Sequence, residues 1–182
     1  MRIYLKSITA TVVVLLSIGC KAEPPKESEY KLTAPVRDIM SSMIMPNADV
    51  LWNAVSTNIT AKGIEEKAPQ TPEEWKVVHN SAVTIAEASN LIVMPGRRVA
   101  APGEKETDPD VNLSPEKIEA MIDRDRVTWI KMAKDLHDAI LPALKAIDAK
   151  DPKALADAGA GIDKACEDCH LKFWYPKEAG KK

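Results

Sequence analysis

The sequence Cys166-Glu167-Asp168-Cys169-His170 lies close to the C-terminus of this 182-residue chain. On a helix, a step of three residues holds both thiols on one face, and the histidine follows directly. Two cysteines separated by two residues and followed by histidine are typical of covalent c-type haem attachment. Each thiol would add to one vinyl group of the porphyrin, and His170 would be an axial ligand of the iron. The motif therefore predicts one haem c, bound through Cys166 and Cys169.

Two other chemistries use cysteines at this spacing. A redox dithiol of the thioredoxin type is expected at the start of a helix in a βαβ context, and the sequence has no such context. A zinc site needs two more ligands, and no second Cys/His pair at ligand spacing occurs in the sequence. Haem attachment is the interpretation that these observations favour.

The N-terminal residues 1–19 have the features of a signal peptide. Arg2 and Lys6 precede the mostly apolar stretch 8–18, which is shorter than the about 20 residues of a membrane span. Gly19 stands directly before Cys20, so the segment resembles a bacterial lipoprotein signal, in which that cysteine is acylated. Export agrees with the haem prediction, because bacteria attach c-type haem outside the cytoplasm.

Acylation of Cys20 would anchor the protein to a membrane on the periplasmic side. Lys21 stands where an aspartate is associated with retention in the inner membrane, which indicates the outer membrane. Ordinary cleavage with a free Cys20 is the alternative, although a lone thiol is a liability in an oxidising compartment. Residues 20–33 are polar and contain two prolines, so we expect a flexible tether before a domain of residues 34–182.

The domain is expected to contain four amphipathic helices and no strand. Apolar residues recur there at steps of three and four. The first expected helix runs from Pro35 to about residue 60, with a break near Pro46. The second runs from the capping sequence Thr71-Pro72-Glu73-Glu74 to Pro95-Gly96. The third begins at Ser114-Pro115 and bends at Pro142, and the fourth runs from Asp151-Pro152 into the cysteine motif. The predicted fold class is all-α, an antiparallel four-helix bundle in up-down-up-down order.

This organisation, with a single CxxCH at the end of the last helix, resembles the class II cytochromes c, the cytochrome c prime group, over residues of about 34–176. The stretches ADVLW, MPGRR and CEDCHLKFWYP are also similar to a set of uncharacterised proteobacterial cytochrome c-like lipoproteins. The resemblance implies a haem-binding four-helix bundle. Members of the group differ in whether a methionine or an empty position lies opposite the histidine.

The bundle order suggests which other residues lie near the haem, because the end of the fourth helix would lie beside the start of the first. Met40 lies about five residues into the first helix, some 7 to 8 Å along its axis, at a height comparable with that of His170. Met40 is therefore our candidate for the sixth iron ligand, with core packing as the alternative. Met43 and Met94 are weaker candidates, and Met45 is expected on a different side of the helix.

Arginines and aromatic residues are expected at the same end. Arg97 and Arg98 follow the second helix, and guanidinium groups bind carboxylates, so Arg97 is our candidate for a haem propionate. A solvated basic loop is the alternative, and Arg37 is a weaker candidate for the same task. Residues 173–175, Phe-Trp-Tyr, would cover the haem edge or close the end of the bundle. His79 and His137 are predicted to lie too far along their helices to reach the iron.

Two functions fit these residues. With His170 and a thioether sulfur on the iron, the protein would transfer electrons to a periplasmic or membrane redox partner. With an empty apolar position opposite His170, it would bind small gases such as nitric oxide or carbon monoxide. An enzyme is not expected, because no polar acid/base group is predicted on that side. The formal net charge of −2 gives no reason to expect nucleic-acid binding. The sequence does not decide whether two chains form a homodimer.

Overall fold

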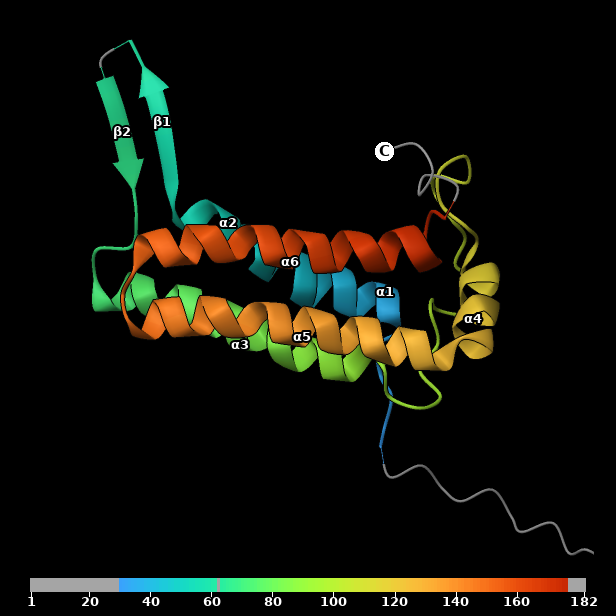
Figure 1. Cartoon of the computed structure of the whole chain (residues 1–182). Coiled ribbons are helices and arrows are strands. Elements are labelled where there is room, and N and C mark those ends of the chain that lie inside the picture. The colour runs from blue at the N-terminus through green and yellow to red at the C-terminus, as the bar shows by residue number, and fades with distance from the viewer. Residues whose placement is uncertain (1–29, 62, 177–182) are drawn as a thin grey trace, which may run out of the picture. The chain divides into compact units, whose positions relative to one another are not determined.

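A computed structural model describes residues 30–61 and 63–176. Its helices and strands all belong to one compact unit that begins at Leu32. The described residues are mostly helical, with one small two-stranded sheet (Figure 1). The predicted signal peptide, the predicted lipid attachment site Cys20 and the predicted tether up to residue 29 lie outside the described residues.

The first helical segment consists of three consecutive parts: α1 (Val36–Ile39), a π-helical turn η1 (Met40–Ile44) and α2 (Met45–Ala54). The wide turn stands immediately before Pro46, which has no backbone N–H to donate. The backbone N–H of Met45 donates to the carbonyl of Met40, five residues earlier. The break expected near Pro46 is thus present as a π-helical turn.

A β-hairpin follows α2, so the prediction that the first helix runs to about residue 60 is wrong, as is the prediction of no strand. Val55 is already extended, with φ −127° and ψ 128°. Strand β1 (Ser56–Thr60) pairs antiparallel with β2 (Gly63–Lys67), and the hairpin projects away from the helices (Figure 1). The β-branched residues of β1 favour a strand, and Gly63 adopts φ 127° next to the turn.

Helix α3 (Pro72–Ile92) begins at the predicted capping box. The Thr71 side chain accepts from the backbone N–H of Glu74 at 3.2 Å, and the Glu74 carboxylate accepts from the N–H of Thr71 at 2.9 Å. These two bonds pair N–H groups that the first turn of a helix leaves free.

The predicted third helix is two helices, α4 (Pro115–Arg124) and α5 (Arg126–Asp148), so the prediction of one continuous helix is wrong. The break is at Asp125, with φ −130° and ψ 53°, whose side chain accepts from the N–H of Thr128 and caps α5. Helix α5 continues through Pro142. Helix α6 (Pro152–Phe173) is capped by Asp151 and carries the cysteine motif in its last turns.

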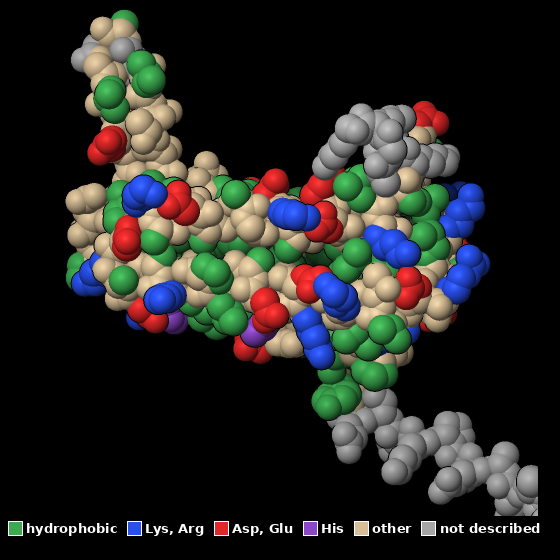
Figure 2. All heavy atoms as spheres, in the orientation of Figure 1, with side chains coloured by type: hydrophobic (Ala, Val, Ile, Leu, Met, Phe, Trp, Pro, Cys, Tyr) green, Lys and Arg blue, Asp and Glu red, His purple; other side chains and the backbone are tan. Residues whose placement is uncertain are grey.

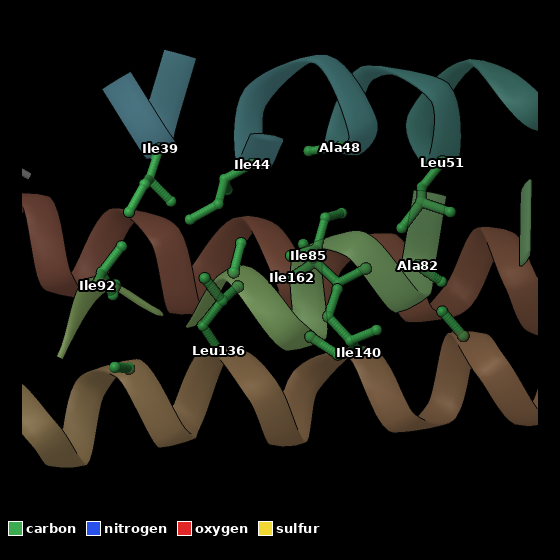
Figure 3. Packing of buried hydrophobic residues seen from close by; sticks show 14 of the residues in the cluster. Ile39, Ile44, Ala48, Leu51, Ala82, Ile85, Ile92, Leu136, Ile140 and Ile162 are labelled. Atoms are coloured by element: carbon green, nitrogen blue, oxygen red, sulfur yellow. The ribbon is translucent and has the colours of Figure 1, made fainter. Parts of the chain in front are cut away.

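The helices pack around one core. Contacts join α2 with α3, α3 with α5, α5 with α6 and α2 with α6, while α4 contacts α5 and α6. Figure 3 shows Ile44 and Leu51 pointing from the first segment toward Ile85, Leu136 and Ile162 on the facing helices. At the end where α6 finishes, the fully buried rings of Trp129 and Phe173 pack edge to face with centroids 5.4 Å apart.

Candidate functional site

A cavity of about 360 Å³ lies among the first helical segment, α5, α6 and the end of α3. Its walls are largely apolar, formed by side chains such as Ile44, Ala48, Ile92, Met132 and Leu136. The volume is within the range of roughly 300 to 1,000 Å³ that is usual for ligand sites. The cavity is therefore large enough to receive part or all of a small organic group.

Cys166, Cys169 and His170 all border this cavity. They lie in the last turns of α6, where the three-residue step places both thiols toward the same space, as predicted from the sequence. Cys169 is buried, and Cys166 and His170 are half-buried. The helix continues past His170 to Phe173, so the motif is held by regular backbone hydrogen bonds.

The surroundings keep both cysteines in the thiol form. Burial raises the pKa of Cys166 to about 11, and the charge of Asp163 adds to this rise. Burial also raises the pKa of Cys169 to about 12, with smaller contributions from Cys166 and Asp135. The motif lies far from the helix N-terminus, whose positive potential lowers the pKa of reactive cysteines. These thiols lack the low pKa that a redox-active dithiol needs.

Burial has the opposite effect on the histidine, because it disfavours the charged imidazolium. It lowers the pKa of His170, while the carboxylate of Glu167 acts in the opposite sense. The neutral imidazole is thereby favoured, and this is the form that binds metals. No group of three or more His, Cys, Asp or Glu side chains that could hold a metal ion occurs among residues 30–61 and 63–176.

Two methionines of the first segment border the cavity. Met40 does so as predicted, and Met45 does so against the prediction that it lies on a different side. The π-helical turn has about one residue more per turn than an α-helix, so residues 40 and 45 come onto one face. Met43 packs against the core, and neither it nor Met94 borders the cavity.

The arginine that borders the cavity is Arg37, and Arg97 lies elsewhere. The Arg97 guanidinium donates to the backbone carbonyls of Leu91, at 2.7 Å, and Ala34. Arg37 forms ion pairs with Glu104 and Glu106 in the loop between α3 and α4. The structure thus brings the weaker of the two candidate arginines to the predicted site.

The aromatic residues after the motif divide between both predicted tasks. Phe173 closes the core against Trp129, whereas Trp174 and Tyr175 border the cavity. The ring of Tyr175 lies 5.7 Å from that of His170, and its hydroxyl donates to Glu167 Oε2 at 2.7 Å. His170 is the one histidine among the described residues that line the cavity, and the predicted exclusion of the other two agrees with this.

No family model matches the sequence, and searches of curated proteins and of solved structures return no match either. Among the described residues, no helix has the length and apolar character needed to cross a membrane.

Proposed function

We propose that this protein is a c-type cytochrome that transfers electrons in the periplasm, with one haem bound covalently through Cys166 and Cys169. The observation that carries the proposal is that both thiols and the His170 imidazole border one apolar cavity together with Met40. Before attachment, haem has two vinyl groups, an apolar ring and an iron centre, and this set of side chains matches each of them. We assign no catalysis to the site.

Different residues of the chain would attach the haem, bind its iron and pair with its propionates. The two thiols hold the group covalently, and the neutral His170 imidazole offers a nitrogen to the iron. The largely apolar walls would limit the amount of water around the group, so that little solvent would reorganise when its charge changes. Arg37 is the arginine at the cavity, and a propionate there would share its guanidinium with Glu104 and Glu106, in the role that the sequence gave first to Arg97. Bound haem would supply a one-electron redox centre.

The same proposal includes the finer fold assignment. We infer an antiparallel four-helix bundle of the cytochrome c prime type, in which the first segment, α3, α5 and α6 are the four members. The contacts among these helices and the position of the motif at the end of α6 support this. Lipid attachment at Cys20, in the outer membrane, is part of the proposal on the sequence argument alone.

Gas binding is the second candidate function, and the apolar lining of the cavity favours it. If Met40 does not bind the iron, Met40, Ile44 and Leu136 surround a space that admits small neutral molecules such as carbon monoxide. Electron transfer is preferred because a thioether sulfur is available in the cavity.

The covalent attachment is tested by replacing both cysteines. The variant with Cys166→Ala and Cys169→Ala, produced alongside a haem-attachment system, should lose the haem stain on a denaturing gel. The matched control is Cys20→Ser, which removes the remaining cysteine of the chain and should keep the stain. A double variant that still carries haem under denaturing conditions would show that attachment through this motif is wrong.

A further inference from the structure

The rim of the cavity between α2 and α6 differs in charge from the rest of the surface. On the face shown in Figure 2, basic and acidic side chains are interspersed. Several charged pairs along the helices are one helical turn apart, such as Lys164 with Asp168 on α6 and Lys131 with Asp135 on α5. Residues 38–61 contain two aspartates, Asp38 and Asp49, and no lysine or arginine. Within α2, Asp49 is the one charged residue, so the α2 side of the rim carries only negative charge.

A third carboxylate faces this rim from α6. Asp163 borders a hollow of about 390 Å³ between α2 and α6, and Trp52 borders both this hollow and the main cavity. Asp38, Asp49 and Asp163 are all exposed, and none forms an ion pair with a basic side chain among the described residues. The cation at the cavity, Arg37, is already paired with Glu104 and Glu106.

An exposed apolar patch lies on α2 beside Asp49. Met45 is 52% solvent-exposed and Trp52 is 37% solvent-exposed, although both border the cavity. They are seven residues apart on α2, hence on one face, and Asp49 lies between them on the solvent side of that face. The neighbouring Ala48 is buried and also borders the cavity, on the inner edge of the same face. An apolar centre within a charged rim is the usual composition of a transient protein interface.

We propose that this rim is the docking surface for a positively charged redox partner, with Met45 and Trp52 as the apolar contact and Asp49 and Asp163 as the anionic groups beside it. The proposal rests on the proposed function, because docking here places a partner directly over the cavity. Charge complementarity selects the partner: a lysine-rich surface is attracted, whereas an anionic surface is repelled.

The test compares two small oxidants of opposite charge acting on the reduced, haem-loaded protein. In each reaction one electron passes from the protein to the oxidant, and no proton moves. The cation is tris(phenanthroline)cobalt(III), which becomes cobalt(II), and the anion is ferricyanide, which becomes ferrocyanide. Rates are measured by stopped flow at an ionic strength near 0.01 M, where the Debye length is about 30 Å, and near 0.15 M, where it is about 8 Å.

The expected result has a definite sign. Added salt should slow the cobalt reaction and speed the ferricyanide reaction. The double variant Asp49→Asn with Asp163→Asn should slow the cobalt reaction roughly three- to tenfold at low salt, since each carboxylate attracts the tripositive ion across a short distance. The control, Glu87→Gln with Asp148→Asn, removes two exposed charges from α3 and the far end of α5 and should leave the rate nearly unchanged.

A second readout does not depend on redox activity. Binding of a short oligolysine peptide, measured by titration calorimetry at low salt, should weaken in the Asp49/Asp163 variant and not in the control. Equal effects of both variants, in either measurement, would overturn the docking surface. Protein dimers that dissociate on Met45→Ser with Trp52→Ser would instead assign the surface to a second copy. A protein that carries no haem contradicts the proposed function, and the peptide titration still decides about the surface.

Discussion

At the level of single residues, the chemistry of the cavity depends on what lies opposite His170. Met40 offers a thioether sulfur, and its side chain is partly buried in the cavity wall. Met43, three residues on, packs against the core and does not border the cavity. Substituting each methionine in turn therefore separates iron ligation from packing, because the same side chain is removed at a position inside the cavity and at one outside it.

In the proposed haem protein, Met40→Ala should remove the proposed sixth ligand and open the position opposite His170. We expect loss of the weak far-red absorption band that sulfur ligation gives to ferric haem, and new binding of carbon monoxide to the ferrous protein. The absorption spectra of both redox states, with and without carbon monoxide, measure this, and Met43→Ala should leave them unchanged. A wild-type protein that already binds carbon monoxide would instead support the gas-binding function.

The packing of Phe173 against Trp129 should contribute strongly to stability. Phe173 is fully buried, so Phe173→Ala removes its contacts and leaves a cavity, at a cost of about 3 to 5 kcal/mol in the free energy of unfolding. Urea denaturation followed by circular dichroism measures the change. Val127→Ala, at a side chain that is 82% exposed, should cost less than about 0.5 kcal/mol. Similar losses in both variants would contradict this role of Phe173.

At the level of elements, the loop between α3 and α4 is fixed to the first helical segment. The backbone N–H groups of Val36 and Arg37 donate to the carbonyls of Arg98 and Val99 at 2.9 and 3.0 Å. Glu106, whose side chain retains only 5% of its exposure, accepts from Arg37 in the same region. These bonds hold Arg37 at the cavity and turn Arg97 away from it.

The Glu106 anchor should make stability depend on pH. Burial raises the pKa of Glu106. Hydrogen bonds from the Asp108 N–H and the Asn112 side chain, together with the charge of Arg37, lower this pKa by more than burial raises it, so the pKa lies below the ordinary 4.5. A carboxyl with a depressed folded-state pKa stabilises the fold above its unfolded-state pKa, and this contribution is lost as pH falls through the folded-state value.

Glu106→Gln should therefore lower stability at neutral pH and reduce the further loss below about pH 4.5. Urea denaturation of both proteins at neutral pH and at several values below 4.5 measures the difference. Asp110→Asn, in an exposed part of the same loop, is the control and should follow the wild-type curve. If the difference between wild type and Glu106→Gln stayed constant with pH, the anchor would not be ionic.

At the level of the whole molecule, attachment to a membrane is predicted to depend on Cys20. Cys20→Ser should move the protein from the detergent phase to the aqueous phase in a detergent-partition experiment, because acyl chains supply the membrane affinity. None of the described helices is long and apolar enough to cross a membrane. Haem content should be the same in both proteins, which separates localisation from cofactor attachment. Unchanged partitioning would contradict lipid attachment.

Much of the fold could be predicted because its signals are local. Apolar periodicity and caps such as the Thr71 box determine where α3 and α6 form. The hairpin was not predicted because the helical pattern of the first segment was extended into the β-branched residues of β1. The break at Asp125 was not predicted because the three- and four-residue apolar periodicity continues across it. Neither error displaced the motif, which depends only on three residues of one helix.

The sequence by itself determined the chemistry of the site: two thiols and an imidazole on one helical face, at spacings that follow from the geometry of a helix. Only the tertiary structure decided what surrounds them. Met45 joins the cavity because a π-helical turn changes the phase of the first segment. Arg37 replaces Arg97 there because hydrogen bonds between residues more than sixty positions apart orient the loop. Such long-range contacts are absent from any local pattern, since they exist only once the helices have packed.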